Sequence, residues 1–143
     1  MANFSDYLER ELLIHLLQDS TFSKPSTIAI ALTSGVPLDA HTGADNYEIA
    51  NAGSYARVVN ASGDTYWNVS SLASGSGVAE NDTVITFSAA TADWGIVSGV
   101  MILDNGTYGA GNVLMHGALT TARNVLNGDT FQFSTRQLDI TLQ

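Results

Sequence analysis

The sequence predicts a mainly β fold, an antiparallel β-sandwich or jelly-roll-like domain with one N-terminal amphipathic helix. Thirteen glycines and only two prolines, set among many Ser, Thr and Asn residues, are typical of a turn-rich β architecture. Apolar and polar residues alternate between residues 131 and 142, which is the period of a strand with one buried face. Near the N-terminus, apolar residues instead recur every four positions and indicate a helix.

Length and composition favour one domain. The chain has 143 residues, and a chain of this length buries roughly 68–70% of the surface that its unfolded state exposes. Hydrophobic residues make up 45% of the chain and charged residues only 13%, unlike the composition of a disordered chain. We therefore expect residues 1–143 to form a single β-rich domain, with a helix at about 4–19 and strands from about 27 to 142.

The helix at 4–19 carries recognisable start and stop signals. Asn3 or Ser5 can cap it, and acidic residues in its early turns suit the positive end of the helix dipole. Lys24-Pro25 lies shortly beyond its end. The apolar stripe is wider than a single seam, so we expect the helix to pack against a sheet or a partner subunit. The residues that form and widen this stripe are Phe4, Leu8, Leu12, Leu13, Ile14, Leu16 and Leu17.

Short strand-like segments follow the helix. They are residues 27–34, 55–59, 65–69 and 82–89. The polar passage 35–54 has the composition of a loop, and a loop of this length in a compact domain is usually functional or ordered by a partner. Residues 70–81 have the composition of a Gly/Ser linker.

Two denser apolar runs, at about 95–103 and 112–119, predict a further pair of strands. Asn105-Gly106 lies between them and tolerates the positive φ of a turn. Additional glycines at 109 and 111 favour a longer, looser hairpin. Asn127-Gly128-Asp129 predicts another turn before the alternating C-terminal segment, which gives about seven or eight strands in total.

The charge balance argues against nucleic-acid and membrane partners. Five basic residues face fourteen acidic ones, which gives a net charge of -9 and a single lysine. Phosphate binding needs clustered Lys and Arg, and an anionic membrane repels an acidic surface. No segment has the pattern of a signal peptide or a membrane span. The absence of cysteine excludes disulfides and thiolate metal sites.

The sequence predicts no cofactor, no metal site and no catalytic residue. His15, His41 and His116 are far apart and have no metal-ligand spacing. Asp39, His41 and Asp45 could offer ligands to a cation, but their spacing matches no EF-hand loop. No G-x-S-x-G elbow is present. A catalytic carboxylate pair stays open, because the spatial pairing of fourteen acidic residues is invisible in sequence.

Six stretches occur in an order that spans almost the whole chain. They are YLERELLIHLL (7–17), IAIALTS (28–34), GSYAR (53–57), ITFSAATADWGIVSGVMILD (85–104), LMHGALT (114–120) and NGDTFQFSTRQLDITL (127–142). Together they resemble a family of small tailed-bacteriophage virion proteins, described as head decoration (cement), minor tail or tail-fibre-like proteins. The passage 42–52 is longer than the family's usual glycine-rich link. The resemblance implies a non-enzymatic, β-rich virion component that assembles as a trimer.

The first hypothesis is therefore a cement protein that trimerises on the outer capsid surface and binds the major capsid protein. A trimer would carry -27 (3 × -9), and the polyanionic genome would repel it from the capsid interior. A chain without cysteine suits assembly in the host bacterial cytoplasm. The alternative is a tail or baseplate protein involved in host attachment, with tail proteins or a host receptor as partners. A carbohydrate-active enzyme is a third hypothesis.

The helix and the 35–54 loop are the expected contact elements. Candidate interface residues are Leu8, Leu12 and Leu16 on the helix and Tyr47 in the loop. The alternative for the three leucines is that they cover the chain's own sheet. Receptor binding would use exposed aromatic residues on distal loops, for which Tyr47, Tyr66 and Tyr108 are candidates.

Overall fold

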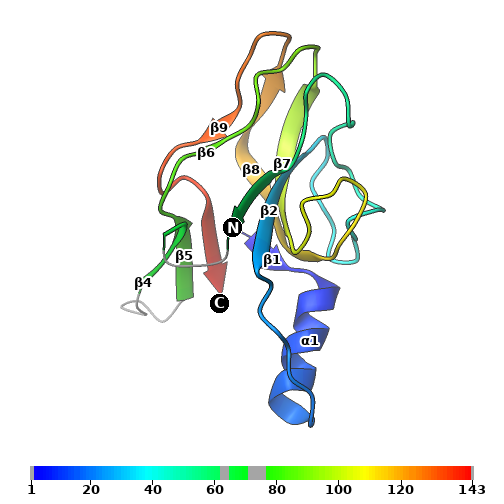
Figure 1. The fold of residues 1–143 in the computed structure, drawn as a ribbon, viewed down its shortest axis with the longest axis vertical. Coiled ribbons are helices and arrows are strands. Elements are labelled where there is room, and N and C mark those ends of the chain that lie inside the picture. Colours follow the sequence, from blue (N-terminus) through cyan, green and yellow to red (C-terminus); the bar gives the residue numbers. More distant parts are fainter. Residues whose placement is uncertain (1, 62–64, 71–76, 143) are drawn as a thin grey trace.

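Two layers of strands form the body of the protein, and one helix projects from it (Figure 1). The computed structural model describes residues 2–61, 65–70 and 77–142. The helix is α1 (Asp6–Leu17). The strands are β1 (Ala2–Phe4), β2 (Thr27–Thr33), β3 (Val58–Ala61), β4 (Trp67–Ser70), β5 (Gly77–Asn81), β6 (Ile85–Thr86), β7 (Gly95–Leu103), β8 (Val113–Val125), β9 (Gln132–Phe133) and β10 (Asp139–Leu142).

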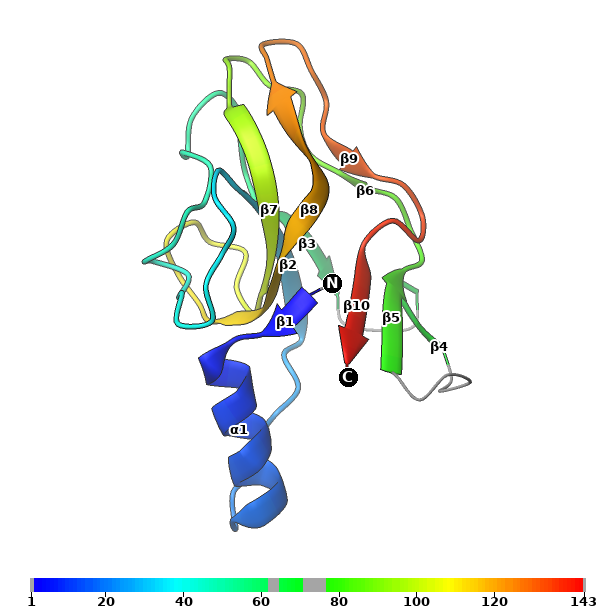
Figure 2. The ribbon, with the colours of Figure 1, turned by 180° about the vertical axis from the view of Figure 1, so that it is seen from behind.

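The strands form three antiparallel sheets. The largest has the order β1-β8-β7-β2-β3, the second has the order β10-β5-β4, and β6 pairs with β9. The two smaller sheets lie on one side of the large sheet (Figures 1 and 2). The prediction of a mainly β, antiparallel architecture with one helix near the N-terminus is confirmed.

The main core lies between the large sheet and the two smaller ones. Ile30 and Ile102 from the large sheet belong to the same buried cluster as Ile85 and Ile140 from the small sheets. Phe87 and Phe131 meet edge to face with ring centroids 5.9 Å apart. The period-two pattern of the C-terminal segment is visible here, because its alternate apolar residues turn inward. The buried residues of this segment are Phe131, Phe133, Leu138 and Ile140.

The other face of the large sheet is buried as well. Ala29, Ala31, Met101, Leu103 and Val113 form a second cluster whose members are fully buried. Figures 1 and 2 place the segments 34–54 and 104–112 on this side of the sheet. The central strands are therefore apolar on both faces, because the two smaller sheets cover one face and two long loops cover the other.

The helix is shorter than predicted, and a strand precedes it. Phe4 pairs with Met115 in β1, so the chain is extended where the sequence predicted helix, and strands begin at Ala2 instead of about 27. The Ser5 hydroxyl caps α1, accepting from the Leu8 N–H at 3.2 Å while it donates to the carbonyl of Val113. Figure 2 shows α1 extending away from the sheets. No helix among the described residues is long and apolar enough to cross a membrane.

Other boundaries differ where strand partners decide the outcome. The predicted linker 70–81 contains β5, which gains its order by pairing with both β4 and β10, while 71–76 lie outside the described residues. Only Ile85–Thr86 of the predicted strand 82–89 forms a ladder. β8 continues to Val125, past the predicted end at 119. The long connection between β7 and β8 confirms the loose hairpin.

Candidate interaction surfaces

A buried arginine joins the two long loops. Arg57 donates from Nε and Nη2 to the two carboxylate oxygens of Glu48, at 2.9 and 2.7 Å. The same guanidinium donates to the carbonyls of Gly43, Asn105 and Ala110, at 3.0, 2.9 and 2.8 Å. Neither charged side chain reaches solvent, with exposed fractions of 0% and 2%. The buried Arg57–Glu48 pair therefore links the loop 35–54 to the loop 104–112 on their inner side.

Tyr55 extends this network into the large sheet. Its hydroxyl donates to Glu48 Oε1 at 3.0 Å and accepts from the N–H of Leu32 at 3.0 Å. Burial, reinforced by the Glu48 carboxylate, raises the pKa of Tyr55. Arg57 and Glu48 are not among the residues that the sequence patterns single out. The available signal was the Tyr-x-Arg spacing in GSYAR, which puts both side chains on one side of an extended segment.

Backbone contacts complete the connection between the loops. Thr42 bridges Asn112, and the Gly43 N–H donates to the carbonyl of Gly111 at 3.0 Å. Within the 104–112 loop itself, the Asp104 carboxylate accepts from the backbone and side-chain N–H groups of Asn112 at 2.7 and 2.8 Å. We call residues 35–54 and 104–112 together the loop platform.

The loop platform presents two of the candidate tyrosines. Tyr47 and Tyr108 are 45% and 41% exposed, whereas Tyr66 is half-buried outside the platform. The ring of His41 stands edge-on to Tyr47 with centroids 4.7 Å apart. The predicted interface residue Tyr47 is therefore accessible.

The possible cation ligands do not converge. Asp39 Oδ1 lies 2.9 Å from Nε2 of the buried His116, while His41 Nδ1 accepts from the Leu38 N–H. His15 is elsewhere and accepts from the Phe22 N–H. Within the described parts of the chain, no three His, Cys, Asp or Glu side chains are grouped to hold a metal ion.

The three candidate leucines of the helix lie in different environments. Leu8 is buried in the main core, and Leu12 packs against that core. Leu16 is 74% exposed, and its neighbours Leu13 and Leu17 are 58% and 78% exposed. The part of α1 up to Leu12 thus covers the chain's own sheet, and the free half of α1, from Leu13 to Leu17, presents uncovered leucines.

An apolar groove lies at the base of the helix. Its volume is about 270 Å³, and it is bordered by α1, by the segment that returns from α1 to β2, and by strands of both layers. Val69, one of its lining residues, is 73% exposed, and Lys24 is the single charged residue among the described residues of the lining. The apolar side chains that carry the argument below are Leu8, Phe22, Ile28, Trp67, Val69 and Ile140.

Comparison with known families decides the class of protein. Residues 3–141 match the family described as Podophage GP4 fiber I protein gp80. The chain belongs to this fibre I family. A comparison with curated proteins finds no significant match. The resemblance to small tailed-phage virion proteins is confirmed, and the chain is a structural protein of the virion.

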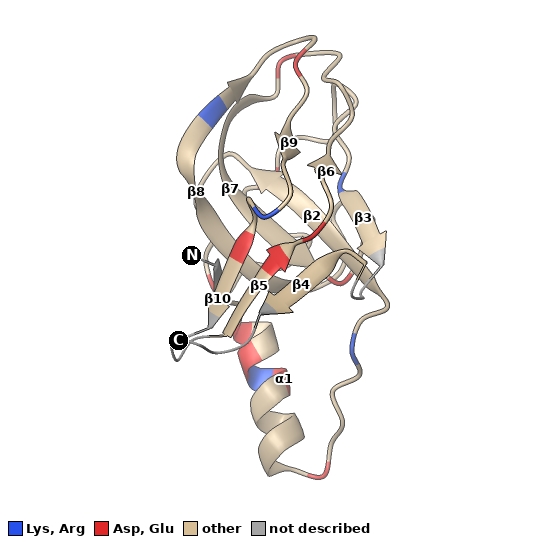
Figure 3. Cartoon of the chain, turned by 90° about the vertical axis from the view of Figure 1, so that its left-hand side faces the viewer, with Lys and Arg blue, Asp and Glu red and all other residues tan. Residues whose placement is uncertain are grey.

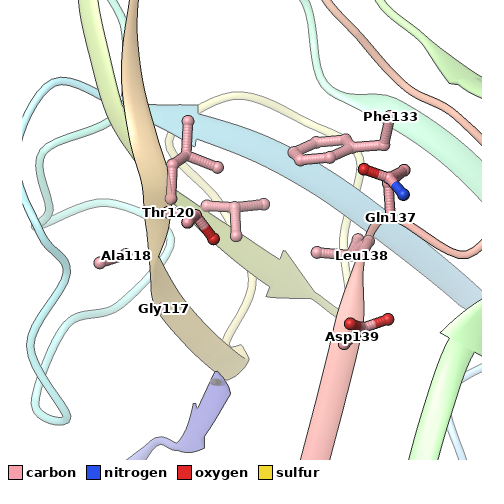
Figure 4. Close-up of a pocket in the computed structure, with 9 residues that line it drawn as sticks. Gly117, Ala118, Thr120, Phe133, Gln137, Leu138 and Asp139 are labelled. Carbon is pink, nitrogen blue, oxygen red and sulfur yellow. The ribbon is translucent and has the colours of Figure 1, made fainter.

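A second, polar groove of the fibre I chain bears on the enzyme hypothesis. Figure 4 shows it between β8 and the segment 133–139, with Thr120 on one side and Gln137 and Asp139 on the other. Its volume is about 100 Å³. Asp139 is the single carboxylate among the described residues that line this groove, whereas glycoside hydrolysis uses a pair. This groove does not supply the two carboxylates that a carbohydrate-active enzyme would need.

Charges of the fibre I chain are dispersed. Figure 3 shows acidic residues on β5, β10, α1 and the loops, with basic residues scattered singly among them. Three arginines lie within salt-bridge distance of a glutamate, as Arg10–Glu11, Arg57–Glu48 and Arg136–Glu80. The described surface therefore offers no cluster of free cationic groups for phosphate binding.

Proposed function

We propose that this fibre-family chain is a non-enzymatic subunit of the phage tail fibre, lies on the outside of the virion, and docks through the free half of α1. The observation that carries the proposal is the exposure of Leu13, Leu16 and Leu17 on a helix that projects from the body. Covering a leucine side chain is favourable by roughly 1.5–3 kcal/mol. Each of these three side chains that a docking partner covers would therefore add to the binding free energy.

The family description supports a tail location, because it names a fibre. The net charge of -9 suits an external position at either the tail or the capsid, since both lie away from the packaged genome. The capsid decoration role, with the major capsid protein as partner, is the competing proposal. In either position a homotrimer is the expected assembly.

Electron cryo-microscopy of intact virions, labelled with gold-coupled antibodies against the chain, distinguishes the two locations. We expect gold confined to the tail. Label distributed over the capsid shell would overturn the tail assignment and favour decoration.

A pair of variants tests whether α1 is the docking element. Leu16→Asp with Leu17→Asp leaves the core intact, because both side chains are exposed, and we expect virions to lose the protein. Ile96→Asp is the matched control, since Ile96 is also exposed, at 60%, but lies on β7. Normal incorporation of the double variant would refute docking through α1.

A second candidate function is contact with the host surface through the loop platform. The observation in its favour is that Tyr47 and Tyr108 are exposed on loops held by the buried Arg57–Glu48 pair. Rigid, exposed aromatic side chains are favoured at binding surfaces. Tyr47→Ala with Tyr108→Ala should slow adsorption to host cells without loss of the protein from the particle. Unchanged adsorption would exclude this role.

A further inference from the structure

The end of α1 and the apolar groove both present apolar side chains at the surface. The helix end offers apolar side chains at 13, 16 and 17, the spacing by which an amphipathic helix enters a groove. The groove offers apolar walls, with Val69 uncovered at its edge. Each of the two exposes apolar surface that a second body could cover.

A chain cannot fill its own groove with its own helix end. Leu8 is part of the groove wall and is fixed in the core, so α1 starts at the groove and runs away from it. Leu17 is nine residues further along, about 13 Å along the helix axis. The exposed leucines are therefore out of reach of the groove in the same molecule.

Charge favours a second copy as the occupant. Lys24, the only lysine of the chain, lies at the groove, and no carboxylate is found among the described residues that line it. Asp19 lies two residues beyond Leu17, the last residue of α1, and the first two turns of α1 carry further acidic residues. An incoming helix end would bring its leucines to the apolar walls and its acidic group to Lys24.

We propose that the end of α1 of one copy inserts into the groove at the base of α1 of a second copy. The contact is head to tail, because the helix end and the groove are different surfaces. Three copies form the expected trimer if the rotation closes after three, and a longer chain of copies forms if it does not close. This inference rests on the proposal that α1 is a docking element, and it names the partner and the receiving site.

Mixing two variants of the purified chain tests the geometry. Leu16→Asp with Leu17→Asp destroys the helix end, and Val69→Asp destroys the groove; all three side chains are exposed, so folding should be unaffected. We expect each variant alone to be monomeric, with self-association at least about tenfold weaker than wild type. Their equimolar mixture should form a heterodimer and nothing larger, because one intact helix end and one intact groove remain. The Ile96→Asp control should assemble as wild type does.

Native mass measurement gives outcomes that either support or overturn the contact. Monomeric wild type at micromolar concentration, or assembly unaffected by Val69→Asp, would overturn it. A mixture that remains monomeric would show that the helix end of one copy does not enter the groove of another, and would also overturn it. These results are independent of where the protein sits on the virion, which the antibody labelling decides.

Charge reversal and crosslinking provide a second test. Lys24→Asp should weaken assembly, and adding Asp19→Lys should restore it if the two groups meet. The chain has no cysteine, so Leu17→Cys and Val69→Cys are the sole thiols when the two variants are mixed. We expect a disulfide between the two species, whereas Leu17→Cys mixed with Ile96→Cys should remain uncrosslinked. Failure of both rescue and crosslinking would reject the contact.

Discussion

Arg57 Nη2 lies 2.7 Å from Glu48 Oε2 in an ion pair that is shielded from solvent on both sides. The remaining donors of the guanidinium reach three backbone carbonyls of the loop platform. A buried pair of this kind is a weak source of net stability, but removing one partner leaves an uncompensated charge. The pair therefore fixes how the two loops meet, and the loops in turn cover the outer face of the large sheet.

Arg57→Met should destabilise the fold by about 3–5 kcal/mol, because it leaves the Glu48 carboxylate buried and three carbonyls without their donor. Urea denaturation followed by tryptophan fluorescence measures the loss. Adding Glu48→Gln should recover part of it, since the uncompensated charge is removed. A double variant as unstable as the sum of the two single variants would show that the pair is not coupled.

The raised pKa of Tyr55 predicts that the fold loses stability at alkaline pH. Burial and the Glu48 carboxylate raise the pKa of Tyr55 above the ordinary value of about 10. The folded chain therefore holds this proton more tightly than the unfolded chain does. The stabilisation is complete below about pH 10 and falls by at most about 1.4 kcal/mol per pH unit above it.

Melting temperatures of wild type and Tyr55→Phe, compared between about pH 8 and 11, test this linkage. The variant should be less stable at pH 8, because it lacks two hydrogen bonds, but should fall less steeply at high pH. Tyr108→Phe, which removes the hydroxyl of an exposed tyrosine, is the matched control. Parallel curves for Tyr55→Phe and wild type would contradict the assignment.

Asn81 is fully buried and satisfies four backbone groups. Its Nδ2 donates to the carbonyls of Thr83 and Ser134, and its Oδ1 accepts from the N–H groups of Gln137 and Leu138. Asn81→Leu should lower the free energy of unfolding by about 3 kcal/mol or more, because buried backbone donors and acceptors lose their partners. Urea denaturation should show almost no effect for Asn51→Leu, an exposed control. A cost below about 1 kcal/mol would mean that the turn re-forms without Asn81.

The elements predicted best are those with a strong local signal. The predicted bounds of β2 and β7 agree closely with the observed ones, since apolar runs bounded by turn residues suffice for central strands. β1 was missed because Phe4 also fits the helical period, and its pairing with β8 depends on residues more than a hundred positions away. The sequence does not predict β5, because this segment becomes a strand only by pairing with β4 and β10.

The candidate interface was predictable in part. A helical stripe indicates which side is apolar, but not where the body beneath the helix ends, so Leu8 and Leu16 looked equivalent although one is buried and the other exposed. The length of the loop 35–54 predicts a functional loop or one ordered by a partner, and this stays a prediction. Its role as one half of the loop platform depends on Arg57, whose contacts in 104–112 are about fifty positions away and leave no periodic trace.

Gly43 lies where the two loops touch, and its replacement should separate them. A Cβ at this position would be 2.0 Å from the carbonyl oxygen of Ala110, a backbone atom that cannot move without displacing the loop. Gly43 also donates to Gly111 and accepts from Arg57. Gly43→Ala should therefore lower the free energy of unfolding by about 2 kcal/mol, because the added methyl group overpacks this contact.

Hydrogen exchange can locate this damage. Amides of 104–112 should exchange faster in Gly43→Ala, whereas those of β7 in the main core should lose only the protection that follows from the lower global stability. Ala44→Ser, at the exposed neighbouring position, should leave both regions as in wild type. Uniform acceleration across β7 and the loops would mean that the platform and the sheet open together. In that case the loops would be part of one cooperative unit with the sheet that they cover.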